Sequence, residues 1–193
     1  PMAEFINTLL FGIYPYIALA VLAVGSVIRY DREPYSWRAG SSQLLRRKQL
    51  IVGSVLFHVG VLMIFAGHVV GLLTPIALFD ALGIPHVAKQ MLAIVAGGVA
   101  GVIAIIGATL LIHRRFFDPR VRAASNFSDN MVILLLWAQL ALGLATIPYS
   151  MQHLDGHEMV KFMDWAQGIF TFRSGAAGRI QDVALVFKLH LTL

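Results

Sequence analysis

The sequence predicts an all-α fold: an integral membrane helix bundle of five transmembrane helices, with the fifth truncated at the C-terminus. Three observations predict it. The chain is 58% hydrophobic and only 13% charged, whereas soluble proteins carry about 25% charged residues. Four apolar runs are long enough to cross a bilayer, and a fifth begins near the end of the chain. No polar block approaches the roughly 100 residues of a water-soluble domain, so we expect residues 1–193 to form a single membrane domain.

The four complete runs cover residues 5–28, 50–74, 91–112 and 131–149. No Lys or Arg precedes the first run and no small-residue cleavage site follows it, so we expect an uncleaved span rather than a signal peptide. The fifth run begins near Val183 and is still apolar at Leu193, which covers about half a bilayer. A helix that ends inside a membrane leaves its last carbonyls without partners, so we expect the native chain to continue.

The positions of Lys and Arg predict the orientation. Ten basic residues lie in the segments after the first and third runs, against four in the segments on the opposite side. The ten are Arg29, Arg32, Arg38, Arg46, Arg47, Lys48, Arg114, Arg115, Arg120 and Arg122, and the four are Lys89, Lys161, Arg173 and Arg179. Loops on the cytoplasmic side of a membrane are enriched in these residues, so we expect the N-terminus to lie outside. The net charge of +5 is therefore explained by topology and a lipid surface, and we expect no nucleic acid partner.

One polar segment on the outer side contains an amphipathic pattern. Within residues 152–179, apolar residues recur at helical spacing at Met159, Phe162, Met163, Ala166 and Phe170. We expect a short helix that lies at the membrane interface.

The absence of cysteine limits the possible redox chemistry. A chain without Cys forms no disulfide, no thiolate-bound iron–sulfur cluster and no covalent c-type haem attachment. Any redox metal in this chain must be held by His, Met or carboxylate ligands.

Two histidines lie in the second apolar run. Ionisable side chains inside a membrane are costly and by default indicate a functional site. His58 and His68 are ten residues apart, which places them about 15 Å apart along a helix and about 80° apart around it. Both can therefore serve the same side of a bundle at two depths, as two stacked redox centres require.

A third histidine matches one of these depths. His190 comes early in a helix that enters from the outside, and His68 comes late in a helix that leaves there. One His from each of two facing helices can bind a haem iron axially, so we expect His68 and His190 to ligate haem b. His58 lies deeper, and we expect its partner beyond Leu193. The alternative for any single intramembrane His is an interhelical hydrogen bond, while His86, His113, His153 and His157 lie at span ends or in loops and are weaker candidates.

The glycines of the second and third runs, and Lys89, can each be interpreted in two ways. Gly60, Gly67 and Gly71 form a stripe on one helix face, and Gly97, Gly98, Gly101 and Gly107 punctuate the third run. Close helix packing explains them, and room for a flat macrocycle is the sharper alternative. Lys89 lies at the outer mouth of the third run, and either extends to the interface or donates a hydrogen bond to a quinone carbonyl.

Several ordered segments carry a family resemblance, among them IYPYIA, RYDREPYSWRAGSSQLL, FHVGVLMIFAGHVVGLLTP, KQMLAIVAGG, RRFFDPRVRA, ALGLATIPYS and FKLHL. With these segments the chain resembles the gamma subunit of respiratory nitrate reductase, a membrane diheme cytochrome b. The resemblance implies five spans and two haems b. It assigns the outer haem to His68 and His190, and the inner haem to His58 with a ligand that is missing beyond Leu193.

The resemblance also implies a substrate and partners. Residues matching Gly67, His68 and Lys89 form the quinol site beside the outer haem. Electrons then pass to a cytoplasmic iron–sulfur beta subunit and to a molybdenum-containing alpha subunit, which reduces nitrate, in a bacterial or archaeal cytoplasmic membrane. Two alternatives stay open: the cytochrome b of another quinone-linked complex (hydrogenase, formate dehydrogenase or sulfur metabolism), and a proton-coupled transporter. The spans contain no carboxylate, which argues against the transporter.

Overall fold

The computed structural model describes residues 2–36 and 42–193, and all the regular elements in these ranges are helical. Arg38 of the first basic segment lies outside them. The α-helices are α1 (Met2–Thr8), α2 (Tyr14–Arg32), α3 (Arg47–Leu73), α4 (Ile76–Ala81), α5 (His86–Phe117), α6 (Pro119–Ala123), α7 (Phe127–Gln152), α8 (His157–Phe170) and α9 (Leu185–Thr192). A π-helical turn (Leu9–Ile13) joins α1 to α2, and 3-10 turns cover Pro34–Ser36 and Ala176–Ile180. The predicted all-α class is confirmed.

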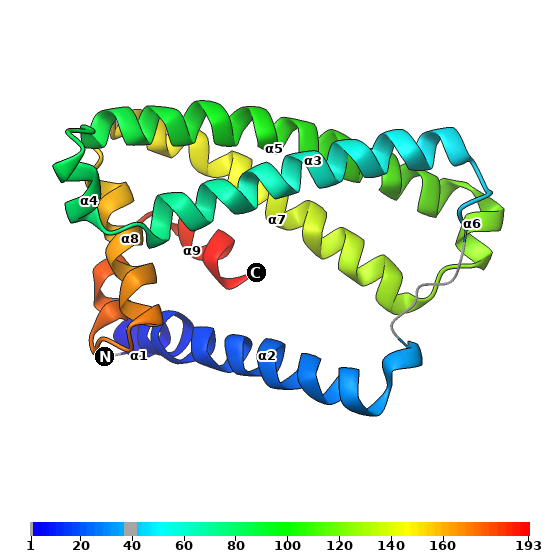
Figure 1. Cartoon of the computed structure of the whole chain (residues 1–193), viewed down its shortest axis with the longest axis horizontal. Coiled ribbons are helices and arrows are strands. Elements are labelled where there is room, and N and C mark those ends of the chain that lie inside the picture. Colours follow the sequence, from blue (N-terminus) through cyan, green and yellow to red (C-terminus); the bar gives the residue numbers. More distant parts are fainter. Residues whose placement is uncertain (1, 37–41) are drawn as a thin grey trace.

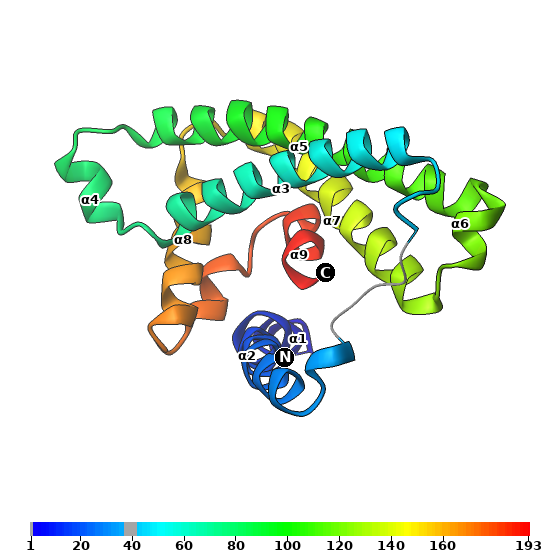
Figure 2. The ribbon, with the colours of Figure 1, turned by 45° about the vertical axis from the view of Figure 1, so that its right-hand side comes forward.

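Four helical segments are long and apolar enough to cross a membrane: Met2–Arg32, Arg47–Leu73, His86–Phe117 and Phe127–Gln152. They correspond to the four predicted spans. The fifth apolar run is helical from Leu185, and α9 lies between α7 and the pair α1–α2 (Figures 1 and 2).

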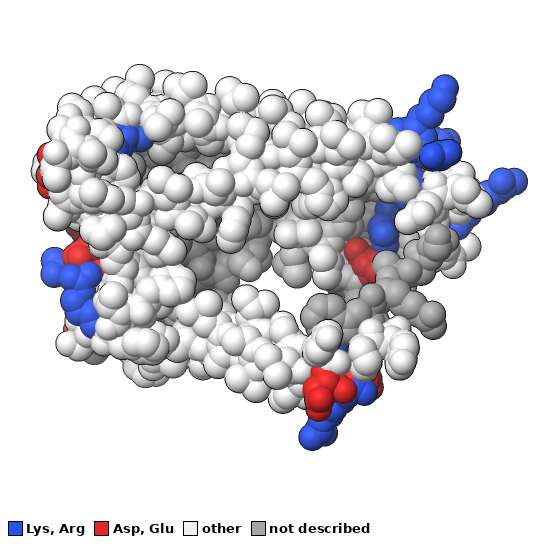
Figure 3. All heavy atoms as spheres, viewed as in Figure 1, with Lys and Arg blue, Asp and Glu red and all other residues white. Residues whose placement is uncertain are grey.

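The outside of the bundle is apolar, as a lipid-facing surface must be. Leu62 and Phe65 of α3 are 65% and 66% exposed, although both are large hydrophobic residues. On the face drawn in Figure 3, charged side chains gather at the two ends of the long axis, with an uncharged band between them. An apolar surface of this extent requires a membrane or partner to cover it.

Helices α3 and α5 make the closest helix–helix contact, and glycine permits it. A Cβ atom on Gly60 would lie 2.6 Å from the Ala104 backbone nitrogen, and one on Gly107 would overlap the backbone of Phe57. By contrast, Gly67, Gly71 and Gly97 have open space where a Cβ would stand. Close packing therefore explains only part of the predicted glycine stripe.

We expect Gly107→Val to destabilise the bundle severely. The added methyl groups meet rigid backbone of α3, and overpacking a well-packed contact costs about 1–3 kcal/mol, occasionally more. Thermal unfolding in detergent measures the loss. Gly97→Val, on the same helix but facing open space, is the matched control and should change stability by less than about 1 kcal/mol. Equal melting temperatures for the two variants would contradict the described α3–α5 contact.

Helix α8 lies across one end of the bundle, which we call the α8 end, where α3 ends and α5 begins (Figure 1). The last carbonyls of a helix have no partner within the helix. Gln167 of α8 donates to the carbonyls of Leu72 and Thr74, both at 3.0 Å, and so caps α3. The predicted amphipathic helix is confirmed: Met163 and Ala166 are buried, although Phe170 at its end is exposed.

Three side-chain hydrogen bonds join the N-terminal helices to α8 and the segment that follows it. Trp165 donates to the carbonyl of Phe11 at 2.9 Å, within the π-helical turn. Tyr16 donates to the carbonyl of Ile169 at 3.0 Å, and Asn7 to that of Ala177 at 2.8 Å. Beside them, a hydrophobic cluster of Phe11, Ala177, Ile180 and Val183 packs against Phe162, Phe187 and other partly buried apolar side chains. These contacts position the start of α9.

An ion pair also joins α8 to the segment before α9. Lys161 Nζ lies 2.9 Å from Asp182 Oδ2. The hydrogen bond between them raises the pKa of Lys161 and lowers the pKa of Asp182. The pair therefore remains charged on both sides of neutral pH.

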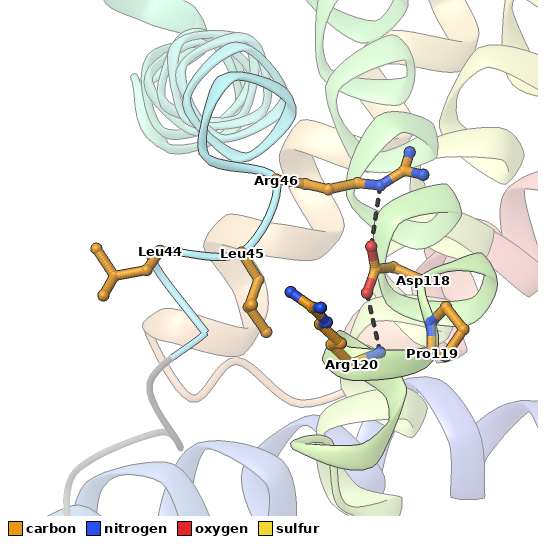
Figure 4. A pocket seen from close by; sticks show the side chains of 6 residues that line it. All are labelled: Leu44, Leu45, Arg46, Asp118, Pro119 and Arg120. Atoms are coloured by element: carbon orange, nitrogen blue, oxygen red, sulfur yellow. Dashed lines mark hydrogen bonds and ion pairs between the residues drawn. The ribbon is translucent and has the colours of Figure 1, made fainter.

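The opposite end, which we call the basic end, uses some of its arginines for packing. Arg114 is 3% exposed and donates to the carbonyls of Ser42 and Leu45, so it is not a surface residue as the loop assignment implied. Arg46 pairs with Asp118 at 2.9 Å beside a surface pocket (Figure 4). Asp118 also caps α6, and hydrogen bonds from the backbone N–H of Val121 and Arg120, then from Arg46, hold the pKa of Asp118 below its usual value.

Candidate functional site

The structure brings His68 and His190 together. His68 lies near the end of α3 and His190 near the end of α9, and their ring centroids are 6.3 Å apart at an interplanar angle of 56°. These residues are 122 positions apart in the chain, so α8 and the turns after it are what return α9 to α3. The two histidines that membrane depth paired therefore lie next to each other in the structure.

The spacing of the two rings fits a single metal ion between them. A metal–nitrogen bond is about 2 Å, and the nitrogen lies roughly 1 Å from its ring centre, so two rings on opposite sides of one ion have centres about 6 Å apart. The observed 6.3 Å agrees. Two neutral imidazoles are also a donor set that haem iron accepts.

The tautomer of His68 is determined by its own helix. Its Nδ1 lies 2.8 Å from the carbonyl of Ile64, one turn earlier, and a carbonyl oxygen only accepts. Nδ1 is therefore protonated, which leaves the lone pair of Nε2 for a metal. His58 has the same arrangement, with Nδ1 2.7 Å from the carbonyl of Ser54.

His58 lies on α3 nearer to the basic end than this pair. It is ten positions from His68 in α3, which is about 15 Å of helix. Its side chain is exposed, and its ring touches Phe57 edge-on. The structure thus presents His58 as a second imidazole on the same helix, with no histidine ring stacked on it among the residues that the structure describes.

Helix α7 holds His190 through two residues that the pattern of histidines did not reveal. Gln139 donates to the carbonyl of His190 at 2.8 Å. One turn later, a Cβ on Gly143 would lie 3.1 Å from Cε1 of the His190 ring, so the imidazole rests where another residue would place its side chain. A signal for Gln139 did exist, because it is an amide within an otherwise apolar span.

Lys89 is in the first turn of α5, at the α8 end. It is 8% exposed, and its Nζ lies 4.4 Å from the centroid of the Phe79 ring. Nζ has no hydrogen-bond partner within the described ranges. A lysine that extends to the interface exposes its amine to water, whereas the amine of Lys89 is buried.

The open glycines lie on the same half of α3 as His68. Gly67 is its neighbour in the chain and Gly71 follows. Apart from chain neighbours and the backbone of α3 itself, no heavy atom of the described residues lies within 4 Å of a Cβ built on either. This part of α3 therefore offers space for a flat ligand beside the imidazole.

The remaining histidines lie where the sequence placed them. His86 begins α5 and lies 3.8 Å from Asp80, and His113, in the last two turns of α5, lies 3.1 Å from the Gln49 amide. His153 and His157 are exposed at the end of α7 and the start of α8. None of these four is paired with another histidine ring among the described residues.

Comparison with known proteins gives a consistent result. The nitrate reductase gamma subunit family model matches residues 7–193. The respiratory nitrate reductase 1 gamma chain of Escherichia coli (strain K12) is 50% identical over 190 residues, which are 98% of this chain and 84% of that protein. The nitrate reductase gamma chain of Bacillus subtilis (strain 168) is 36% identical over 185 residues, which are 96% of this chain and 82% of that protein.

Proposed function

The chain belongs to the nitrate reductase gamma subunit family, the membrane cytochrome b subunit of that enzyme complex, and we propose that it oxidises quinol and passes the electrons to the partner subunits. One observation carries the proposal: the ring centroids of His68 and His190 lie 6.3 Å apart, a spacing that two axial ligands of one iron would have. The chain is in that case one part of an enzyme whose nitrate-reducing chemistry occurs in a partner.

We assign one haem b to His68 and His190, and one axial position of a second haem b to His58. His68 and His58 each hold their Nδ1 proton on a backbone carbonyl and direct Nε2 away from their helix. When bound, haem would supply one-electron steps between a two-electron quinol and the redox centres of the partners. No residue among 1–193 is assigned as the second ligand of the haem at His58.

Lys89 and the open face beside His68 form the proposed quinol site. A buried ammonium group without a hydrogen-bond partner is unfavourable, and a quinol or quinone oxygen would supply the missing acceptor. The ring of the ligand would lie in the space at Gly67, next to His68. Oxidation of quinol to quinone releases two protons and two electrons. The protons leave at the α8 end, which we assign to the outside.

The basic end is the proposed docking face for the cytoplasmic partners, an iron–sulfur beta subunit and a molybdenum-containing alpha subunit. Arg46, Arg114 and Arg115 are already engaged in contacts within the chain. The basic residues that stay exposed there include Arg47, Lys48, Arg120 and Arg122. Such a surface favours a partner with an acidic face and speeds its association.

We expect Lys89→Ala to slow quinol oxidation while leaving haem in place. A hydrogen bond to a charged group contributes about 1.5–3 kcal/mol, so its loss should lower kcat/KM for quinol by about 10-fold to 100-fold. Stopped-flow reduction of the haem by quinol, in membranes that contain the assembled complex, measures it.

The matched control is Lys161→Ala, another lysine at the α8 end, which contacts Asp182 and lies outside the proposed site. It should oxidise quinol at the parent rate. A Lys89→Ala protein that keeps the parent rate, or that loses its haem, would contradict the proposed role of this lysine.

A further inference from the structure

We propose that the α8 end carries a binding site for the headgroup of a phosphatidylethanolamine lipid. The site is formed by Arg173, Glu4 and Asn7, where the N-terminal helices meet the segment that follows α8. Arg173 would bind the phosphate, while Glu4 and the side-chain oxygen of Asn7 would accept hydrogen bonds from the ammonium group. The site includes neither the histidines nor Lys89, so the inference goes beyond the proposed function and does not depend on it.

The proposed site is a surface pocket with a volume of about 550 Å³. Its lining comes from α1, the π-helical turn and the first turn of α2 on one side, and from the end of α8 and the residues after it on the other. Sites for small molecules have volumes of about 300–1,000 Å³. The lining contains two charged side chains, Glu4 and Arg173, and they have opposite signs. The pocket therefore matches a ligand that carries both charges.

Arg173 keeps hydrogen-bond donors for a ligand. Its Nη2 donates to the carboxylate of Asp164 at 2.6 Å and to the Asp164 carbonyl at 2.8 Å. A guanidinium group also carries N–H donors on its other two nitrogens, and within the described ranges those of Arg173 have no acceptor. The side chain is 46% exposed, so these donors are accessible. Because the planar fork of arginine matches phosphate oxygens, Arg173 can bind a phosphate while it keeps its contact with Asp164.

Helix α1 supplies acceptors that have no donor. Asn7 is 7% exposed and donates from Nδ2 to the carbonyl of Ala177 at 2.8 Å, but its buried Oδ1 has no partner among the residues described. A buried acceptor without a donor is unfavourable. Glu4 lies one turn earlier, is exposed and forms no ion pair in the part of the chain that the structure describes. An ammonium group has three donors and a positive charge, whereas an anionic headgroup such as that of phosphatidylglycerol would be repelled by the Glu4 carboxylate.

The surroundings of the pocket fit a lipid rather than a water-soluble ligand. Tyr16 and Phe172, which line the pocket, stack with their ring centroids 5.5 Å apart and their planes 9° apart, and Phe172 is exposed. Aromatic side chains gather at the headgroup level of a membrane, where an amphipathic ring is most stable. The stacked pair therefore places the pocket at the depth of lipid headgroups.

An exposed apolar stripe on α2 leads from the pocket into the membrane. Ile13 lines the pocket and Ile17 follows one turn later. Ile17, Val21 and Ile28 are all exposed and lie on one face of the helix. A lipid with its headgroup in the pocket can lay an acyl chain along this stripe, whereas a free phosphate ion would leave the stripe uncovered.

The test is native mass spectrometry of the assembled complex, delipidated in detergent and titrated with dioleoyl phosphatidylethanolamine or dioleoyl phosphatidylglycerol. We expect the parent complex to bind phosphatidylethanolamine more tightly. Arg173→Gln should weaken this binding by about tenfold, because it removes a charged donor to the phosphate. Glu4→Gln should remove the preference between the two lipids, because it removes the carboxylate that distinguishes ammonium from glycerol.

Arg179→Gln is the matched control. Arg179 also pairs with Asp164, at 2.9 Å, but it does not line the pocket, so this variant should bind phosphatidylethanolamine as the parent does. Equal affinities of Arg173→Gln and Arg179→Gln for this lipid would overturn the inference. So would a parent complex without a preference between the two lipids, or a preference that survives Glu4→Gln. Because Glu4 is exposed, its variant keeps the test decisive even if Arg173→Gln does not fold.

Discussion

His68→Ala is expected to eliminate the haem bound between α3 and α9, and with it the transfer of electrons from quinol. The variant removes one of the two proposed axial nitrogens, and the methyl group of alanine offers an iron no ligand. His68 is exposed on α3 and its one recorded hydrogen bond is to the carbonyl of its own helix at Ile64. Its loss should therefore cost little folding stability. Haem per chain, measured from the reduced minus oxidised absorption spectrum, should fall by one.

The control for this variant is His86→Ala, at the same end of the bundle. His86 lies 3.8 Å from Asp80 and is not stacked on another histidine ring among the described residues. It should keep the parent haem content. A His68→Ala protein that still binds the parent amount of haem would show that His68 is a packing or hydrogen-bonding residue.

Gly143→Val is expected to have nearly the same effect without changing any ligand. The first added carbon would lie 3.1 Å from Cε1 and 3.5 Å from Nε2 of His190. The two further methyl groups of valine then compete with the ring for its place. Because the interior of a helix bundle is close-packed, the cost of about 1–3 kcal/mol is relieved most easily by turning His190 away from His68. Haem content should fall by one, as in His68→Ala, while α7 remains helical.

Gly25→Val on α2 is the matched control, because a Cβ there would have no heavy atom of another described helix within 4 Å. It introduces the same β-branched residue into a membrane-spanning helix and should retain haem. If Gly143→Val also retains haem at the parent level, the close seating of His190 on α7 does not matter for ligation.

The sequence predicted the helices and the histidine pair for clear physical reasons. A span is recognisable because about 20 apolar residues are needed to cross a bilayer, wherever the helix packs. His68 and His190 were paired from depth alone, since His68 is late in a span that leaves at the outer side and His190 is early in a span that enters there. The structure places their rings side by side.

The residues that contact His190 from α7 could not be predicted in the same way. Gln139 and Gly143 contact His190 because α7 packs against α9, and the order of spans along a chain does not determine which helices touch. The contacts of the glycines could not be predicted from the sequence either. Gly60 and Gly107 pack against a neighbouring helix, whereas Gly67 and Gly97 face open space, although all four are intramembrane glycines.

Charge patterning was informative about regions but not about single residues. Basic side chains do gather at one end of the bundle, yet Arg114 is buried on the carbonyls of Ser42 and Leu45. A guanidinium group can satisfy several carbonyls at once, which makes an interior arginine tolerable. Only the tertiary fold distinguishes such an arginine from its exposed neighbours.

The most direct test of the central claim is a dithionite-reduced minus oxidised absorption spectrum of the purified native subunit, with haem quantified per chain. The account predicts a b-type spectrum, with at least the haem held between His68 and His190 present in stoichiometric amount. Folded protein with no haem would contradict it. The pairing of His68 with His190 at 6.3 Å would then be a contact between two interior histidines without a metal.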